Sequence, residues 1–405
     1  MKLLLDGAKV IDGLGGVTAP GWVLVEDGKI AGVGRGDASP RLQMRAEHPA
    51  SVVDLAGKTV LPGLIDCHVH LALDASPDPM KPVAGEGPGH SALKIALHAR
   101  HTLESGFTTV RDLGARAFAT IEVRHAINSG LIPGPRMLCA GHLICMTGGH
   151  GWPIGREADG VDGVRRAARE QLKAGADLVK LMATGGVLTP GTQPGAAQLT
   201  FEELRAGVEE AHKAGRKAAA HAQGSEGIRN AVLAGMDSIE HGFFLTDEII
   251  RMMVERGVYL VPTLTAARAI VEHGKESGIP AAAVDKATAA QDAHVKSFAA
   301  ALKAGVKVAM GTDAGTPFNE HGRNAQEIAL MVEHGMSEAE AIISATSRAA
   351  ELLGIGDSVG SVSVGKVADL LVVSGDPLKD IRVLADPEAI ASVYQAGKLV
   401  AGRST

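Results

Sequence analysis

Two histidines separated by a single residue, His68 and His70, stand in the apolar run LIDCHVHLA. In a β-strand alternate side chains point to the same face, so both imidazoles would lie together while Cys67 and Val69 point the other way. Two imidazole nitrogens on one face are a potential pair of metal ligands. In a chain with 16 histidines such a pair can also be incidental, so the spacing needs support from the rest of the sequence.

A lysine interrupts another apolar run, LVKLMATGG, which contains Lys180. An ammonium with its ordinary pKa of about 10.4 is costly to bury unless it is paired or neutralised. Two interpretations remain open. In the first, Lys180 forms an ion pair with a carboxylate in the interior of the same domain. In the second, its amine has reacted with carbon dioxide to give a carbamate, an anionic ligand that can bridge two metal ions.

Three further strand-like runs end in potential metal ligands. They are AAAHA with His221, SIEHG with His241 and GTDAG with Asp313. The tripeptide EHG occurs four times, so only its context gives it meaning. His273 and His334 end helical segments, where the following glycine is an ordinary C-cap and a cation suits the helix dipole. Of the four, only His241 follows a short strand-like run.

These runs belong to a regular alternation of short apolar runs with longer segments of helical period. With His70 and Asp313 as markers of the first and last run, seven steps cover 243 residues, about 35 each, which suits one strand, one helix and two loops. The pattern predicts an α/β protein with a (β/α)8 barrel over residues 59–355, and active sites of such barrels lie at the carboxyl ends of the strands. The expected strands are VLPGLIDCHVHLA, TTVRDLG, RMLCAGHLI, LVKLMATGG, KAAAHA, SIEHG, YLVPTLTA and VAMGTDAG.

The connectors and the two flanks carry their own signals. Thr200 and Glu203 have the spacing of a capping box, which predicts that the following connector is a helix. In the flanks, WVLVEDGKIAGVG and SVYQAGKLVAG each place a turn between alternating apolar runs. Since each flank is small for a core of its own, residues 1–58 and 356–405 are predicted to form one discontinuous β-sandwich domain.

The composition excludes several classes of protein. The chain has 405 residues, 51 of them Gly and 11 aromatic, and a net charge of −6. Because the chain has no basic run and too few aromatic residues for a stacking platform, nucleic acid is not an expected partner. A charge at Asp6 comes too soon for a signal peptide, and no apolar run could span a membrane, so a cytoplasmic protein is expected. Cys67, Cys139 and Cys145 lack a CxxC spacing and are predicted to be reduced.

The combination of these motifs resembles the amidohydrolase superfamily, in its binuclear branch with a carboxylated lysine. The resemblance covers essentially the whole chain, including LPGLIDCHVH at the entry to the barrel and VGSVSVGKVADLLVVSGDP near the C-terminus. More narrowly, TGGHG, VKLMATGG and MGTDAGTPF are similar to the imidazolonepropionase-like group, which includes Xaa-Pro and Xaa-Arg dipeptidases, carboxypeptidases and ochratoxin-hydrolysing amidohydrolases. Each motif is weak alone, but the combination is specific.

The resemblance implies two divalent metal ions. The implied ligands of the first ion are His68, His70 and Asp313. Those of the second ion are His221 and His241. A carbamate formed from carbon dioxide on Lys180 would bridge the two. The imidazole-rich set suits Zn²⁺, although Mn²⁺, Co²⁺ and Fe²⁺ fit the same ligands.

The resemblance further implies that the chain hydrolyses an amide bond in a small molecule. A hydroxide bridging the two ions would attack the carbonyl carbon, and Asp313 would pass its proton to the leaving nitrogen, because an amine leaves poorly unless it is protonated. Dipeptides and N-acyl amino acids are the expected substrates, with a xenobiotic amide as an alternative. Relatives often assemble, which implies a homo-oligomer.

Three residues are candidates for contact with the substrate. His150, in the TGGHG loop, would bind the substrate or polarise its carbonyl; the alternative is a loop histidine held by glycines. Gln223, in AHAQG, stands where related peptidases often have Tyr or His, and this departure leaves the identity of the substrate open. His321 lies in the loop beyond the last strand-like run and fits either a substrate-binding residue or a solvated loop histidine.

Two other functions compete with amide hydrolysis at a binuclear site. One is a deaminase or a cyclic-imide or lactone hydrolase of the same superfamily. Mononuclear deaminases need no lysine on the fourth strand and use a glutamate as acid and base near the later histidine ligands. Lys180 argues for the binuclear branch, and Glu240 is expected to face away from the site because it is adjacent to His241 on a strand. The other is a metal-free scaffold, which would require a missing ligand, whereas all six positions are filled. GSVSVGKV nearly matches a phosphate-binding loop, but Val367 replaces its Ser/Thr.

Overall fold

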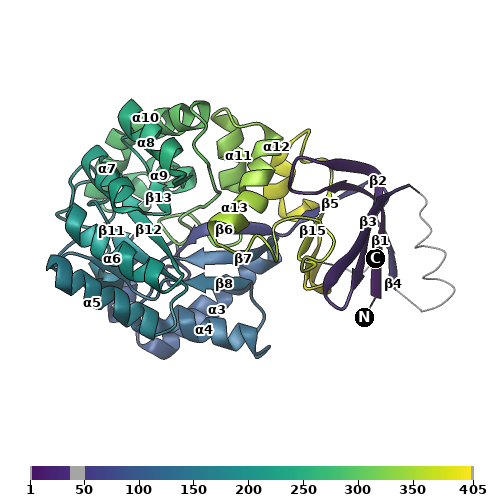
Figure 1. Ribbon diagram of the computed structural model, residues 1–405, viewed down its shortest axis with the longest axis horizontal. Helices are drawn as coiled ribbons and strands as arrows, with labels where there is room; N and C mark the ends of the chain where they lie inside the picture. The colour runs from purple at the N-terminus through teal and green to yellow at the C-terminus, as the bar shows by residue number, and fades with distance from the viewer. Residues whose placement is uncertain (1, 37–50, 403–405) are drawn as a thin grey trace.

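The computed structural model describes residues 2–36 and 51–402. Figure 1 shows the helices gathered around the barrel strands, with a β-sheet beside them that holds both ends of the chain. Within the described ranges, no helix is both long and apolar enough to cross a membrane. Cys67, Cys139 and Cys145 are buried and form no disulfide.

Parallel strands form the barrel in two hydrogen-bonded sheets. Their orders are β6-β7-β8 and β10-β9-β11-β12-β13-β14. The strands are β6 (Leu64–Val69), β7 (Phe107–Asp112), β8 (Arg136–Cys139), β9 (Leu143–Cys145), β10 (Gly155–Glu157), β11 (Leu178–Met182), β12 (Lys217–Ala222), β13 (Ser238–His241) and β14 (Tyr259–Val261). The α/β class expected from the sequence is confirmed, and the parallel order of these strands is consistent with the expected barrel.

Two of the expected strands differ from their prediction. The run RMLCAGHLI divides into β8, which pairs with β7, and β9, which pairs with β11. The run around Asp313 forms isolated bridges in place of a regular strand. Its segment, residues 307–314, nevertheless closes the ring, because Ala309 N–H donates to Leu260 of β14 at 3.0 Å and Cys67 of β6 donates to Met310 at 2.9 Å.

Helices connect the strands and cover the barrel. Thr200 caps α6 with the reciprocal bonds of a capping box to Glu203, as the sequence predicts. The α-helices are α2 (Met80–Gly85), α3 (Pro88–Glu104), α4 (Ala119–Asn128), α5 (Gly160–Lys173), α6 (Phe201–Lys213), α7 (Ser225–Ala234), α8 (Asp247–Arg256), α9 (Leu264–His273), α10 (Ala281–Lys303), α11 (Gln326–Glu333), α12 (Glu338–Ser344) and α13 (Ser347–Leu352). The 3₁₀ turns are η1 (Arg116–Phe118), η2 (Trp152–Ile154), η3 (Lys275–Ser277), η4 (Ile381–Ala385) and η5 (Pro387–Ala389).

The two ends of the chain share one β-sheet. Its order is β17-β16-β15-β5-β1-β2-β3, with β4 paired to β1. The strands are β1 (Lys2–Ile11), β2 (Val17–Glu26), β3 (Lys29–Arg35), β4 (Ser51–Asp54), β5 (Lys58–Pro62), β15 (Leu370–Ser374), β16 (Ile390–Gln395) and β17 (Lys398–Gly402). Leu5 and Val23 from the first flank pack in one buried cluster with Leu370 and Tyr394 from the last. Because β15 pairs with β5, the two flanks are joined by backbone hydrogen bonds.

The chain passes from this sheet into the barrel at Gly63. The expected boundary between residues 58 and 59 falls at the start of β5, which lies in the sheet, whereas β6 lies in the barrel. A Cβ at Gly63 would overlap the side chain of Thr108. Glycine therefore allows the close approach between the connection and β7.

Candidate active site

A cavity lies at the carboxyl ends of the barrel strands. All six potential ligands singled out in the sequence line it: His68, His70, Lys180, His221, His241 and Asp313. They come from β6 and the residue that follows it, from β11, β12 and β13, and from the segment 307–314, so residues far apart in the sequence meet at one end of the barrel. His150 and Gln223 also line this cavity.

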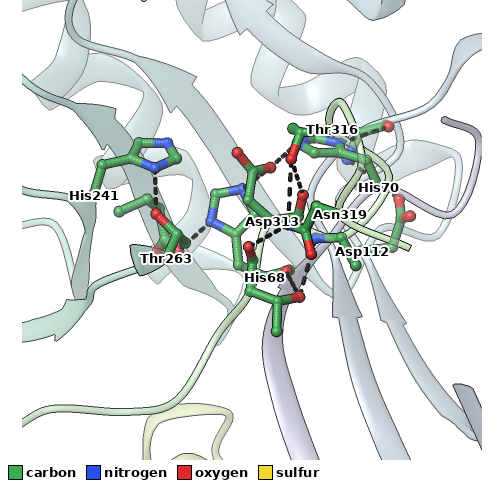
Figure 2. A network of polar contacts seen from close by, with 12 residues as sticks. His68, His70, Asp112, His241, Thr263, Asp313, Thr316 and Asn319 are labelled. Carbon is green, nitrogen blue, oxygen red and sulfur yellow. Dashed lines mark hydrogen bonds and ion pairs between the residues drawn. The ribbon is translucent and has the colours of Figure 1, made fainter. Parts of the chain in front are cut away.

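His68, His70 and Asp313 form a compact group of potential metal ligands. The Asp313 Oδ1 atom lies 3.2 Å from Nε2 of His68 and 3.5 Å from Nε2 of His70. One ligand atom from each residue lies within 4.8 Å of the others, and Figure 2 shows the aspartate carboxylate beside the two imidazoles. This spacing allows one metal ion to contact all three side chains.

His221 and His241 lie next to this group. The centroid of the His241 ring is 5.1 Å from that of His68 and 4.6 Å from that of His221. Nδ1 of His241 is 2.7 Å from the Thr263 hydroxyl (Figure 2), and Nε2 of His221 is 3.0 Å from the carbonyl of Gly185. A hydrogen bond at one ring nitrogen leaves the other free as a metal ligand and fixes the orientation of the ring.

The backbone at the end of β13 corrects the expectation for Glu240. His241 has a φ of 73°, in the left-handed region that residues other than glycine seldom adopt. This turn ends the alternation of faces, and both neighbours point inward: Glu240 Oε2 lies 2.9 Å from Nδ1 of His68. Glu240 is not among the residues that line the cavity, because it contacts the far side of the imidazole. Asp313 also has a positive φ, 60°.

Lys180 is 1% exposed, and among the described residues its Nζ has no hydrogen-bond partner. Burial lowers its pKa to about 8, although Glu240 and Asp313 act in the opposite direction. The ion-pair interpretation therefore lacks a carboxylate in contact with the amine. A buried donor without a partner costs free energy, and a carbamate that binds metal ions would remove this cost. The residues present thus fit a bridged pair of ions.

Burial also controls the protonation of the other groups in the cavity. It lowers the pKa of His70 to about 4 and those of His68, His221 and His241 well below their ordinary value. Burial raises the pKa of Asp313 to about 8, while Lys180 opposes the change. At neutral pH the four imidazoles are uncharged, which is the form in which histidine binds a metal.

The structure brings two of the three candidate substrate residues to the cavity. Nδ1 of His150 lies 2.8 Å from the Thr189 hydroxyl, and the His150 ring is 4.4 Å from that of His221. Gln223 is buried, and its Oε1 has no hydrogen-bond partner among the described residues. Both side chains are thus positioned to contact a molecule in the cavity.

The structure does not bring His321 to this cavity, so its expected contact with the substrate is not supported. His321 is buried, its Nε2 lies 3.0 Å from the carbonyl of Leu73, and its ring stacks on His98 with centroids 4.4 Å apart. It therefore supports the segment that follows His70 and is neither a solvated loop residue nor part of the cavity wall.

Sequence reasoning missed the charged pair beneath the ligands. Arg111 of β7 donates to Glu240 Oε1 at 2.8 Å, and both side chains are at most 2% exposed. Arg111 and Glu240 both stand in predicted barrel strands, in TTVRDLG and SIEHG. Opposite charges in two buried strands are a signal of a pair that could have been found from the sequence.

The chain is similar to known proteins over most of its length. The sequence matches the amidohydrolase family over residues 59–400. It is 33% identical to ochratoxinase from Aspergillus niger, over 98% of this chain and 88% of that protein. A crystal structure of a Xaa-Pro dipeptidase with bound methionine in its active site has a TM-score of 0.90 and 37% identity, covering 98% of this chain and 99% of that one. A prolidase complexed with N-methylphosphonate-L-proline has a TM-score of 0.91 and 33% identity over the whole of both chains.

The fold and the site define a metal-dependent hydrolase that acts on amide C–N bonds. The chain belongs to the amidohydrolase family. The resemblance expected from the HVH, TGGHG and GTDAG motifs is thereby confirmed.

Proposed function

We propose that this chain binds two zinc ions and hydrolyses the amide bond of a dipeptide or an N-acyl amino acid. The observation that carries the proposal is the buried amine of Lys180, which has no hydrogen-bond partner among the described residues and lines the same cavity as four potential histidine ligands and an aspartate. A carbamate on this amine would supply negative charge and oxygen ligands, which neutral imidazoles lack.

Each ion would have its own set of ligands. His68, His70 and Asp313 would hold one ion, as their close grouping supports. His221 and His241 would hold the other, and the carbamate of Lys180 would be a ligand of both. When bound, such ions polarise a carbonyl oxygen and lower the pKa of water towards about 7. The four uncharged imidazoles favour Zn²⁺ among the candidate metals.

Asp313 would move the proton that the reaction requires. Its carboxylate is in the wall of the cavity and beside His68 and His70. A cation beside a carboxyl lowers its pKa, so Asp313 would be ionised when metal is bound. It would then accept a proton from the attacking water and deliver it to the nitrogen of the scissile bond, so that the product leaves as a neutral amine. Glu240, beneath the ligands, would hold His68 in the tautomer with its Nδ1–H proton.

His150 would hold the carbonyl oxygen of the substrate. Gly151 N–H donates to the Thr189 hydroxyl at 3.0 Å. If the Thr189 hydroxyl in turn donates to Nδ1 of His150, the hydroxyl proton has an acceptor. The imidazole of His150 then carries its proton on Nε2. Neutral His150 would then offer an N–H donor to an oxygen on which negative charge develops, which is the role of an oxyanion donor.

The remaining wall of the cavity supports a substrate with an apolar group. Gln223 would bind a polar atom of that substrate, since its amide is buried without a full set of partners. Most other lining residues are apolar: Leu73, Met80, Leu143, Ile154, Met182, Val187, Leu188, Phe243, Ala266, Ala267 and Ile270. A dipeptide with a large apolar side chain or an N-aroyl amino acid suits this wall, and an apolar xenobiotic amide is the alternative substrate.

We also propose that the chain assembles as a homo-oligomer. Leu93 and Leu97 are 76% and 52% exposed and lie one turn apart on α3, and Leu131 is 78% exposed after the neighbouring α4. Exposed leucines close together favour contact with another chain. Light scattering on the purified protein measures the mass of the assembly, and a monomer at all concentrations would contradict this part.

Metal analysis combined with a hydrolysis screen tests the function. Protein grown with zinc should contain about two equivalents of metal, as in other two-metal hydrolases, and should release amino acids from apolar dipeptides or N-acyl amino acids. Lys180→Ala should lose the metal and the activity, whereas Lys296→Ala, on the exposed side of α10, should keep the metal and the activity. Fewer than one equivalent of metal together with full activity of Lys180→Ala would contradict the proposal. Release of ammonia in place of an amino acid would favour a deaminase.

A further inference from the structure

Lys286 of α10 contacts three backbone carbonyls of residues 183–200, which connect β11 with α6 and are called the β11–α6 segment below. Its Nζ lies 3.1 Å from the oxygen of Thr189 and 3.4 Å from those of Gly186 and Val187. An ammonium has three N–H donors and no acceptor, so the three carbonyls match its donors. Burial lowers the pKa of Lys286, and no carboxylate of the described residues offsets the effect.

The same segment contacts His150 and forms a wall of the cavity. The Thr189 hydroxyl lies 2.8 Å from Nδ1 of His150, and a Cβ on Gly186 would overlap the His150 ring. The side chains of Val187 and Leu188 line the cavity. The carbonyls that Lys286 binds therefore belong to residues that orient His150 from two sides or face the substrate.

We propose that Lys286 is a positioning residue, which holds the β11–α6 segment against α10 and, through Thr189, fixes the orientation of His150. The inference rests on the proposed function, because it assigns Lys286 an effect on the hydrolysis in which His150 takes part. Lys286 does not line the cavity, so it acts through the segment and not by contact with the substrate.

Apolar packing alone would not fix the orientation of Thr189 and His150. Val187 packs in one buried cluster with Ala283, Val284 and Ala287 of α10, and such contacts are non-directional. The ammonium adds direction, because each N–H must point at a carbonyl oxygen. Loss of the ammonium is therefore expected to leave the segment in place but to allow small rotations of the peptide groups, and with them of Thr189.

The first test compares three variants. Lys286→Met keeps the aliphatic chain and removes the donors; Lys286→Arg keeps a charged donor group; Lys296→Met is the control on the same helix. Lys286→Met should lower kcat/KM by about tenfold or more, since small misplacements of catalytic groups have effects of this size. Lys286→Arg should recover part of the loss, and Lys296→Met should match the wild-type protein. The three variants should unfold within a few degrees of one another.

The second test asks whether Lys286 acts through Thr189. Thr189→Val removes the hydroxyl that contacts His150. If Lys286 works through this hydroxyl, Lys286→Met should have little further effect on kcat/KM in the Thr189→Val background, because mutations in one chain of contacts are not additive. Hydrogen exchange should become faster in residues 184–192 of Lys286→Met, and this measurement needs no catalytic activity.

Two results would overturn the inference. One is a kcat/KM of Lys286→Met within twofold of wild type together with unchanged hydrogen exchange. The other is full additivity of the effects of Lys286→Met and Thr189→Val on kcat/KM. If the metal-loaded wild-type protein hydrolyses no amide, the proposed function fails instead, while faster exchange in Lys286→Met would still support the clamp on the segment.

Discussion

The carboxylate of Glu240 lies 2.9 Å from Nδ1 of His68, and both side chains are almost completely buried. Glu240 also accepts a hydrogen bond from Arg111. A carboxylate behind a histidine ligand fixes the tautomer and orientation of the ring and makes its other nitrogen a stronger ligand. The ligand group thus rests on a buried charged pair within the barrel.

Glu240→Gln is expected to weaken metal binding while the fold is kept. The amide has the shape of the carboxylate but lacks its charge, and replacement of such a partner typically lowers metal affinity about 10–100-fold. Competition with a chelator measures the affinity. Glu240→Ala should also lower the free energy of unfolding by about 3–5 kcal/mol, because the buried charge of Arg111 loses its carboxylate partner. Wild-type zinc affinity in Glu240→Gln would show that His68 needs no such support.

His241→Ala and His334→Ala form a matched pair, because both histidines stand in the tripeptide EHG. His241 lines the cavity, whereas His334 ends α11. We expect His241→Ala to lose about one equivalent of metal and at least about 100-fold in kcat, since a two-metal site needs both ions to stabilise the reacting oxygens. His334→Ala should keep its metal and its activity. Elemental analysis and steady-state kinetics measure both; equal metal content in the two variants would exclude His241 as a ligand.

Gly186→Ala is expected to impair the site without unfolding the protein. Its Cβ would overlap the His150 ring, whereas a Cβ at Gly195 of the same segment meets nothing within 4 Å. Because a displaced oxyanion donor costs about 100–1,000-fold in kcat, Gly186→Ala should lose much of its activity. Gly195→Ala should behave as the wild-type protein. Comparable kinetics of the two variants would mean that the contact with His150 does not matter for hydrolysis.

His294 makes the folded protein less stable at low pH than at neutral pH. Burial lowers its pKa from 6.5 to about 4 in the folded protein, where its Nε2 is 2.7 Å from the carbonyl of Pro262. Between these values the unfolded chain binds the proton and the folded chain does not. The contribution of His294 to the free energy of unfolding is therefore complete above pH 6.5 and is lost as the pH falls through about 4. The slope is up to about 1.4 kcal/mol per pH unit.

Urea unfolding of the metal-free protein at pH 5 and pH 7 measures this effect. His294→Gln, which cannot titrate, should lose less stability than the wild-type protein between the two pH values. Burial raises the pKa of Asp66 to about 6 and that of Glu327 to about 7, and these carboxyls act in the opposite direction in both proteins. An identical pH dependence of the two proteins would contradict the prediction for His294.

The sequence alone determined much of the architecture. Alternation along LIDCHVHLA predicts His68 and His70 on one face, and both line the cavity. The regular spacing of apolar runs predicts the barrel, and the spacing of Thr200 and Glu203 predicts the start of α6. These predictions succeed because they depend on local periodicity and capping, which neighbouring residues fix.

Only the tertiary structure decided the arrangement at the strand ends. Glu240 faces the interior together with Ser238, and the positive φ at His241 turns the next side chain inward as well, against the alternation expected from the sequence. Lys180 has no carboxylate partner in contact among the described residues, and His321 supports Leu73 and does not reach the cavity. Where a strand ends, the surrounding segments determine φ and ψ, and the partner of a buried charge comes from a distant part of the chain. Periodicity in one sequence contains neither kind of information.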